Sequence, residues 1–166
     1  DWELVAVDGA STDDTTERIA AWAGRLGPRL RWTSEPDGGI FYAMNRGLAR
    51  ARGRWVFFLN ADDRFADAAV LADFEKVLSG AGPEVTAAHG AVSFLDARHG
   101  FEELVEAGHG WWDFVLTRAP HHQGIFMRTA AARTAGGYDP TLGSAADLGL
   151  IAALRTAESA RFLRLD

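Results

Sequence analysis

Hydrophobic and polar positions alternate between strand-like and helix-like patterns over the first 95 residues of the chain. Short apolar runs typical of strands occupy residues 4–7, 30–33, 55–59 and 85–95. Apolar residues at helical spacing predict helices from about residue 12 to 26, 40 to 52 and 66 to 79. The unbroken run Trp55 to Leu59 favours a central strand covered on both faces. Because strands and helices alternate, the sequence predicts an α/β sandwich around a mostly parallel sheet.

The second half of the chain is less regular. Residues 96–118 mix Gly, His and Trp and do not divide clearly into elements. Beyond them, the pattern predicts a strand over 124–127, a short helix over 129–135, a helix over 144–157 and a strand over 161–165. No repeat, linker or low-complexity tract separates these parts, so the sequence predicts one domain over residues 1–166.

Composition restricts the class of protein. The 166 residues are 48% hydrophobic, which is enough to bury the core of one globular domain. The 23 acidic and 17 basic side chains give a formal charge of -6, which argues against nucleic acid as a partner. The chain has no cysteine, so disulfides and thiolate metal sites are excluded. No run approaches the roughly 18 consecutive apolar residues of a membrane span.

The chain opens directly on strand-like sequence, Trp2 to Val7, without an initiator methionine. We therefore expect it to be an excerpt from a longer protein, with localisation or tethering signals outside it.

Oxygen-bearing side chains follow two of the predicted strands. Asp8 comes just after the first strand, and Asn60, Asp62 and Asp63 follow the third. Ligands of open α/β sheets bind at the carboxyl ends of the strands, where these side chains should meet. Oxygen ligands without sulfur or paired histidine favour Mg²⁺ or Mn²⁺. The residues thus suggest a divalent cation that neutralises a phosphorylated ligand.

A purely structural interpretation of the same residues stays open. An Asp-Asp pair after a strand often forms only a turn and the cap of the next helix. The segment Asp8 to Asp13 is equally typical of a capping loop, in which Ser11 or Thr12 accepts hydrogen bonds from the free amides of the helix.

Five segments carry motifs in a specific order. They are Glu3 to Asp13, Ser34 to Gly47, Phe58 to Asp63, the pair His122-Gln123, and Gly136 to Asp147. Together they resemble the motifs of the family 2 glycosyltransferases with the GT-A fold, particularly bacterial enzymes that build cell-surface polysaccharides. The resemblance spans nearly the whole chain. It implies a Rossmann-like, mostly parallel sheet sandwiched by helices, from which the family's first strand and helix are missing.

The resemblance also implies an activity and a set of residue roles. A sugar would pass, with inversion, from a UDP-, GDP- or dTDP-linked donor to a glycan or lipid-linked acceptor. Asp147 would be the general base that takes the proton of the acceptor hydroxyl. Asp62 and Asp63 would hold the Mg²⁺ or Mn²⁺ ion. The donor-binding residues that it implies are Asp8, Asp37, Asn60 and Asp62.

The resemblance also has implications for acceptor binding and for the localisation of the protein in the cell. His122, Gln123 and Trp111 could contact the acceptor or a phosphate. A structural histidine and packing of Trp111 against a helix stay open as alternatives. The resemblance implies a cytoplasmic protein, with peripheral association at the inner face of the membrane through parts outside this chain.

Two other classes of function remain as alternatives. The first is a non-catalytic nucleotide-sugar-binding module or an inactive fragment. It is motivated by Asn60 at the first acidic position of the motif and by Gly149 where relatives often carry a second Asp. The second is a nucleotidyltransferase, which the sequence disfavours because Lys76 is the only lysine and no lysine-rich phosphate loop is present.

Overall fold

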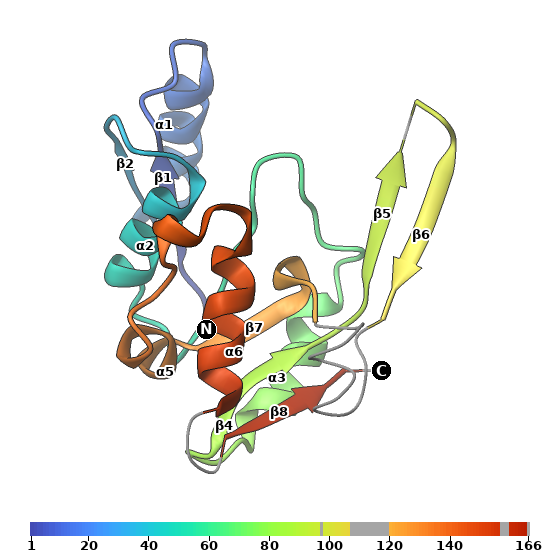
Figure 1. Cartoon of the computed structure of the whole chain (residues 1–166). Helices are drawn as coiled ribbons and strands as arrows, with labels where there is room; N and C mark the ends of the chain where they lie inside the picture. Colours follow the sequence, from blue (N-terminus) through green and yellow to red (C-terminus); the bar gives the residue numbers. More distant parts are fainter. Residues whose placement is uncertain (97, 107–119, 157–159, 166) are drawn as a thin grey trace. The chain divides into compact units, whose positions relative to one another are not determined.

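The computed structural model of the protein describes residues 1–96, 98–106, 120–156 and 160–165 (Figure 1). The chain folds into two compact units, each of which is assembled from two separate stretches of sequence. Unit 1 comprises Asp1–Val56 and Thr129–Leu150, and unit 2 comprises Phe57–Arg128 and Ile151–Asp166.

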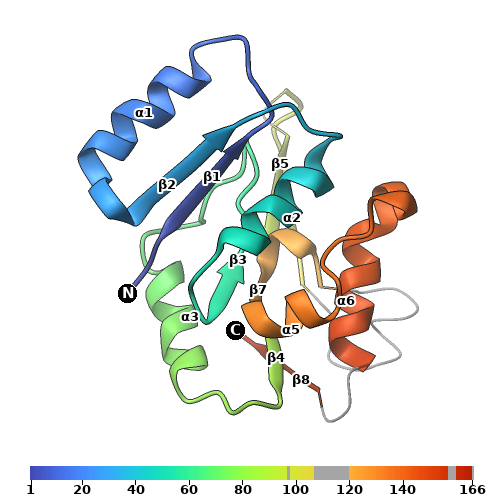
Figure 2. The same ribbon diagram turned by 90° about the vertical axis from the view of Figure 1, so that its left-hand side faces the viewer.

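Unit 1 is built on two parallel strands, β1 (Leu4–Asp8) and β2 (Leu30–Ser34). They are joined by α1 (Thr15–Leu26) and the short 3-10 helix η1 (Gly27–Arg29). Helix α1 packs on β2, and α2 (Ile40–Arg50) packs on β1 (Figure 2). Because the two strands are parallel, Asp8 and Ser34 are register partners and lie at the same edge.

The later residues of unit 1 add helices to α2. They form α5 (Thr129–Thr134), the 3-10 helix η3 (Pro140–Ala145) and the start of α6 (Ala146–Thr156). Helix α5 packs on α2. The buried hydrophobic side chains of unit 1 are Leu30, Met44, Leu48, Ala132, Tyr138, Ala146 and Leu150.

Arg133 joins α5 to the end of α2. Its guanidinium donates hydrogen bonds to the carbonyl oxygens of Leu48 at 2.7 Å and Ala51 at 2.5 Å. The hydroxyl of Thr129 donates to the carbonyl oxygen of Gly53 at 2.7 Å. The last carbonyls of a helix have no partner within it, so the bonds from Arg133 satisfy carbonyls at the C-terminal end of α2, and the bond from Thr129 holds the segment that follows it.

Gly137 follows α5 in a conformation that favours glycine. Its φ is 74°, and a Cβ at this position would lie 2.5 Å from Asn45 Oδ1. We therefore expect Gly137→Ala to lower the free energy of unfolding by about 1–3 kcal/mol. Gly24→Ala is the matched control, because a Cβ at Gly24 in α1 meets nothing within 4 Å. It is expected to raise that free energy by about 0.5–1 kcal/mol. Denaturant unfolding measures both, and equal effects would contradict this account of Gly137.

The main sheet has the strand order β3-β7-β4-β8. The chain passes from unit 1 to unit 2 within β3 (Trp55–Phe57), while β4 (Val85–His89), β7 (Ile125–Arg128) and β8 (Arg161–Arg164) belong to unit 2. Strand β4 runs antiparallel to β7 and parallel to β8, and all of its residues are buried.

The aromatic core of unit 2 centres on Phe126. Its ring centroid lies 4.2 Å from that of Phe74 in α3 (Val70–Ser79) and 4.6 Å from that of Phe57. The short 3-10 helix η2 (His122–Gly124) leads directly into β7. Residues 121–123 are therefore positioned by the rigid core beneath β7.

An antiparallel hairpin forms a separate sheet of unit 2. It consists of β5 (Val92–Asp96) and β6 (Phe101–Val105), paired from Val92 with Val105 to Asp96 with Phe101 (Figure 1). The Asp96 carboxylate stabilises the turn by accepting from the Arg98 amide at 2.9 Å and pairing with His99 Nδ1 at 2.6 Å.

Most predicted elements are confirmed, but three details were wrong. The predicted strand 85–95 is divided into β4 and β5, because the chain changes partner after His89: β4 pairs with β7 and β8, whereas β5 pairs with β6. The helix expected from residue 66 begins at Val70, because Asp67 Oδ1 accepts from the Ala69 amide at 2.7 Å and from the Val70 amide at 3.2 Å.

The third correction concerns the apolar run Trp55 to Leu59. Only residues 55–57 form a strand, and they are half-buried rather than covered on both faces. Among the described strands β3 lies at the end of its sheet, which explains the partial exposure. In the ranges that the structure describes, no helix combines the length and apolar character needed to cross a membrane.

Candidate active site

Asp8, at the carboxyl end of β1, is buried, with 6% of its surface exposed. Its carboxylate accepts hydrogen bonds from the Ser11 hydroxyl, from the Ser34 hydroxyl at 2.6 Å and from the Ser11 amide at 3.0 Å. These bonds, the Ser11 hydroxyl first, lower the pKa of Asp8 below its ordinary value. Asp8 thus holds the loop after β1 to the end of β2.

The lowered pKa gives Asp8 a pH-dependent role in stability. A carboxyl group whose pKa is lower in the folded state stabilises the fold above its unfolded value of about 3.9 and loses that contribution as the pH falls further. We expect Asp8→Asn to lower the melting temperature at pH 7 and to have a much smaller effect near pH 3. Asp14→Asn is the matched control, an exposed carboxylate in the same loop that accepts no hydrogen bond among the described residues. A pH-independent effect of Asp8→Asn would contradict this prediction.

The loop after β2 meets the loop after β1. Asp37 Oδ1 accepts from the Gly39 amide at 2.8 Å, and Asp37 Oδ2 lies 3.2 Å from the position that a Cβ of Gly9 would occupy. The structure thus brings together Asp8 and Asp37, the two candidate donor-binding residues of unit 1. Asp37 is half-buried, so its carboxylate keeps access to solvent.

Asp147 lies in the first turn of α6 and is half-buried. Its Oδ1 accepts from the Leu148 amide at 2.8 Å. Burial, and secondly the Asp147 charge, raise the pKa of the Tyr138 hydroxyl far above its ordinary value. The Tyr138 side chain, which is 3% exposed, therefore keeps its proton beside the carboxylate at all physiological pH values.

The acidic sequence after β3 forms a turn in unit 2. The Asp63 amide donates to the Asn60 carbonyl at 3.2 Å, and Asp62, in the third position, has a φ of 72°. Aspartate is among the few residues that adopt this left-handed conformation readily. The turn leaves the Asp62 side chain exposed and directs Asp63 inward, where it is half-buried.

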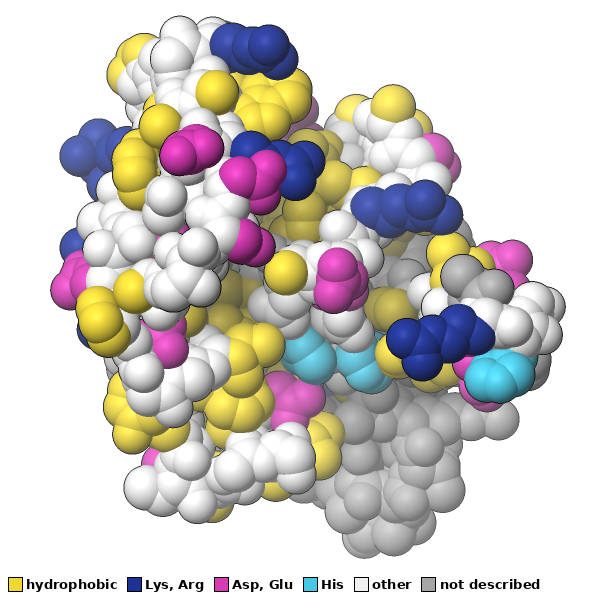
Figure 3. Space-filling model, turned by 90° about the horizontal axis from the view of Figure 1, so that it is seen from above, with side chains coloured by type: hydrophobic (Ala, Val, Ile, Leu, Met, Phe, Trp, Pro, Cys, Tyr) yellow, Lys and Arg dark blue, Asp and Glu magenta, His cyan; other side chains and the backbone are white. Residues whose placement is uncertain are grey.

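Gln123 fixes the Asp63 carboxylate. Its Nε2 donates to Asp63 Oδ1 at 2.6 Å, while the buried Asp63 Oδ2 has no hydrogen-bond partner in the described part of the chain. The rings of His121 and His122 lie beside Gln123 with centroids 4.8 Å apart, and Figure 3 shows two histidine side chains next to each other. One oxygen of Asp63 is therefore held by Gln123, and the other is buried without a hydrogen-bond partner in the described part of the chain.

This arrangement fits a cation that is only partly coordinated by protein. Within residues 1–96, 98–106, 120–156 and 160–165, no three histidine or carboxylate side chains gather to form a metal-binding group. Mg²⁺ characteristically binds one or two carboxylates and takes further ligands from substrate phosphates and water. An unpartnered carboxylate oxygen on Asp63, next to the exposed Asp62, matches that requirement.

The predicted site residues fall on both units. Asp8, Asp37 and Asp147 belong to unit 1, whereas Asn60, Asp62, Asp63, His122 and Gln123 belong to unit 2. Trp111 lies outside the described residues. Their roles in binding or catalysis remain predictions.

Some contacts were not predicted from the sequence. Ser11 or Thr12 was expected to cap α1, but the Ser11 hydroxyl donates to Asp8, and the first amide of α1 donates to Asp13 Oδ1 at 3.0 Å. The partners Ser34 for Asp8 and Gln123 for Asp63 were also missed. Parallel pairing of the first two strands was the signal that could have identified Ser34, because it places their last residues side by side.

Comparison with known proteins gives consistent matches. The model of the family "Glycosyl transferase family 2" matches residues 1–101. A PGL/p-HBAD biosynthesis glycosyltransferase of Mycobacterium bovis BCG is 47% identical over 72 residues, which are 43% of this chain and 28% of that protein. An uncharacterised glycosyltransferase of Mycobacterium tuberculosis is 42% identical over 82 residues, 49% of this chain and 30% of that protein. The chain thus spans less than a third of the length of these relatives.

A solved structure shows the same fold. The mannosyltransferase PcManGT from Pyrobaculum calidifontis, in complex with GDP-Man and Mn²⁺, aligns with a TM-score of 0.68 at 22% identity. The alignment covers 98% of this chain and 45% of that protein. This likeness confirms the predicted GT-A type of α/β fold.

Proposed function

Because the chain belongs to the family 2 glycosyltransferases, we propose that the protein transfers a sugar from a nucleotide-sugar donor to a glycan or lipid-linked acceptor. The named relatives are glycosyltransferases, and the structural neighbour was solved with GDP-Man and Mn²⁺. With a lipid-linked acceptor, the protein would work at the inner face of the membrane.

The acidic turn carries this proposal. Asp63 presents one buried oxygen without a hydrogen-bond partner among the described residues, and Gln123 fixes the other at 2.6 Å. A turn that served only to cap the next helix would not need this carboxylate, because Asp67 already accepts from the amide of Val70, the first residue of α3. We assign Asp62 and Asp63 to a divalent cation, Mg²⁺ or Mn²⁺, and Asn60 to the donor beside it.

The assigned cation supplies one kind of chemistry, neutralisation of the charge that develops on the diphosphate as it leaves the sugar. The residues of the protein would position the cation and the donor diphosphate. Asp62 is exposed at the turn, where it can reach a cation bound to a diphosphate, while Gln123 holds one oxygen of Asp63 by a hydrogen bond. His122 stands beside Gln123 and is assigned to a phosphate or acceptor hydroxyl.

In unit 1 we assign Asp147 as the general base. It would accept the proton of the acceptor hydroxyl while that oxygen forms a bond to the anomeric carbon. The bond from that carbon to the diphosphate breaks on the opposite face, so the configuration inverts. Asp8 and Asp37, whose loops meet at Gly9, are assigned to the nucleoside of the donor. Because the Asp8 oxygens already accept from serines, its role would be mainly to shape the loop that receives the nucleoside.

Release of nucleoside diphosphate tests the proposed function. The full-length protein is incubated with UDP-, GDP- and dTDP-sugars, with and without Mn²⁺, and free nucleoside diphosphate is measured. We expect release from one nucleotide class, stimulated by the metal. Binding of a nucleotide sugar without release under any of these conditions would favour the non-catalytic module instead.

A further inference from the structure

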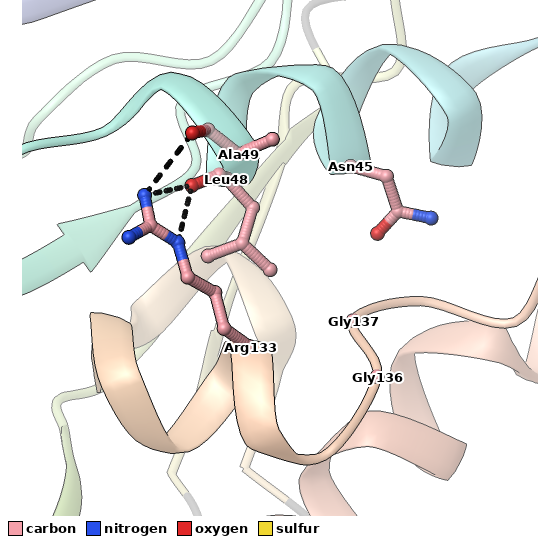
Figure 4. Close-up of a pocket in the computed structure, with 6 residues that line it drawn as sticks. All are labelled: Asn45, Leu48, Ala49, Arg133, Gly136 and Gly137. Atoms are coloured by element: carbon pink, nitrogen blue, oxygen red, sulfur yellow. Dashed lines mark hydrogen bonds between the residues drawn. The ribbon is translucent and has the colours of Figure 1, made fainter.

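Asn45 on α2 is bonded to the backbone of Tyr138, 93 residues further along the chain. Its Nδ2 donates to the Tyr138 carbonyl at 2.7 Å, and its Oδ1 accepts from the Tyr138 amide at 2.8 Å. The side-chain amide thus satisfies both backbone groups of one residue, as a neighbouring strand would. Asn45 borders a pocket lined also by Leu48, Ala49, Arg133, Gly136 and Gly137, and its amide points toward the Gly137 backbone (Figure 4).

The same face of α2 also holds the Tyr138 ring. Phe41 precedes Asn45 by one helical turn, and its ring stacks on that of Tyr138 with centroids 5.5 Å apart and planes 28° apart. Residues four apart on a helix lie on one face. Phe41 therefore contacts the Tyr138 ring while Asn45 binds the Tyr138 backbone from the same face of α2. Gly137 permits the approach, because a Cβ there would lie 2.5 Å from Asn45 Oδ1.

Tyr138, held by the hydrogen bonds with Asn45, begins a short segment that ends at Asp147. Directly after it, Asp139 Oδ1 accepts from the Thr141 amide at 2.9 Å and the Thr141 hydroxyl at 2.7 Å, which begins η3. Leu142 of η3 lies close to α6, since a Cβ at Gly149 would lie 2.7 Å from Leu142 Cδ1. The segment between Tyr138 and Asp147 is thus held at Tyr138 and at the start of η3, and it bends at Gly143, whose φ is 55°.

We propose that Asn45 is a positioning residue for Asp147: through its two hydrogen bonds to Tyr138 it fixes the segment 138–147 and with it the orientation of the base. The proposal rests on the assignment of Asp147 in the proposed function. A base must lie within hydrogen-bond reach of the proton it takes, and a displacement of about 1 Å can lower the rate 10²-fold. Burial is the main cause of the raised pKa of Tyr138, and the charge of Asp147 is the second cause.

A double-substitution cycle in the full-length protein tests this proposal. Asn45→Ala is expected to lower kcat about 10- to 100-fold with little change in the KM for the donor. In the Asp147→Asn background the same substitution is expected to change the residual kcat less than about twofold, because there is no base left to position. Hydrogen exchange of the Tyr138 amide, which donates to Asn45, should become faster in Asn45→Ala.

Met44→Ala is the matched control. Met44 is the neighbouring residue on α2 and is 5% exposed, so its truncation weakens the helix packing without removing a bond to Tyr138. It is expected to lower the melting temperature and to affect kcat equally in both backgrounds. If Asn45→Ala also lowers kcat equally in both backgrounds, Asn45 is merely structural and the proposal is wrong. If Asp147→Asn itself leaves kcat unchanged, the assignment of the base fails instead.

Discussion

Replacing Asp147 with asparagine is expected to lower the turnover number for sugar transfer by about 10²- to 10⁴-fold. Asparagine has nearly the same shape as aspartate but cannot take the proton of the acceptor hydroxyl. The donor-binding assignments lie on other residues, so the affinity for the nucleotide sugar should be unchanged. Initial rates at saturating donor and acceptor, together with calorimetric binding of the nucleoside diphosphate, measure the two quantities separately.

Asp14→Asn provides the control for this substitution. It removes one carboxylate from the exposed loop before α1 in the same unit, and is expected to leave the turnover number within about twofold of the wild type. An Asp147→Asn protein that kept its turnover within the same range would show that another group takes the proton. Lost donor affinity with an unchanged turnover number would instead place Asp147 in the donor site.

Removing the charge of the acidic turn is expected to have an effect of comparable size. Metal-assisted neutralisation of a leaving group contributes several kcal/mol, so Asp63→Asn should lower turnover by on the order of 10²-fold or more. Asparagine can still accept the hydrogen bond from Gln123 Nε2 and thus preserves the local structure. Asp62→Asn tests the other carboxylate of the turn. Turnover as a function of Mn²⁺ concentration should show a strongly raised metal requirement in both variants.

Asp73→Asn separates this effect from a general loss of negative charge in unit 2. Asp73 lies on α3, is half-buried and pairs with Lys76 at 2.8 Å, so its substitution should leave the metal requirement unchanged. If Asp62→Asn and Asp63→Asn respond to Mn²⁺ like the wild type, the acidic turn serves only as a structural turn. The interpretation of this sequence as a simple turn and cap would then be correct.

The periodicity of the sequence was sufficient to identify most helices and strands. Helices such as α2 and α6 bury a continuous apolar stripe, and that stripe is visible as spacing in the sequence. The division of residues 85–95 into two strands was not visible in the sequence, because the residues of both β4 and β5 are typical of strands. The two strands differ in their partners, since β4 pairs with β7 and β8 and β5 pairs with β6, and this pairing depends on the tertiary fold.

The order of strands in a sheet is likewise a tertiary property. The run Trp55 to Phe57 was expected to be central because it is wholly apolar, yet β3 ends its described sheet with β7 beside it. That order also brings η2, just before β7, to the acidic turn after β3 and allows Gln123 to reach Asp63. The residue types in the acidic turn and in η2 indicated functional side chains in both segments. Only the fold shows that these two segments contact each other.

Asp8 shows how a candidate residue gains a more specific interpretation from its partners. As an aspartate after a strand it was equally compatible with ligand binding and with a loop. The structure shows that both of its oxygens accept hydrogen bonds from serines, one in the same loop and one on β2. A nucleoside would therefore meet a prearranged loop rather than a free carboxylate.

Time-resolved proton NMR of the sugar-transfer reaction, run with the full-length protein, Mn²⁺, donor and acceptor, decides between these interpretations. A single displacement assisted by Asp147 predicts that nucleoside diphosphate is released and that the first-formed product has the opposite anomeric configuration to the donor. A product that retained the donor configuration would require a covalent or internal-return step and would contradict the proposed mechanism. If donor bound but no product formed with any acceptor, the protein would be a nucleotide-sugar-binding module instead.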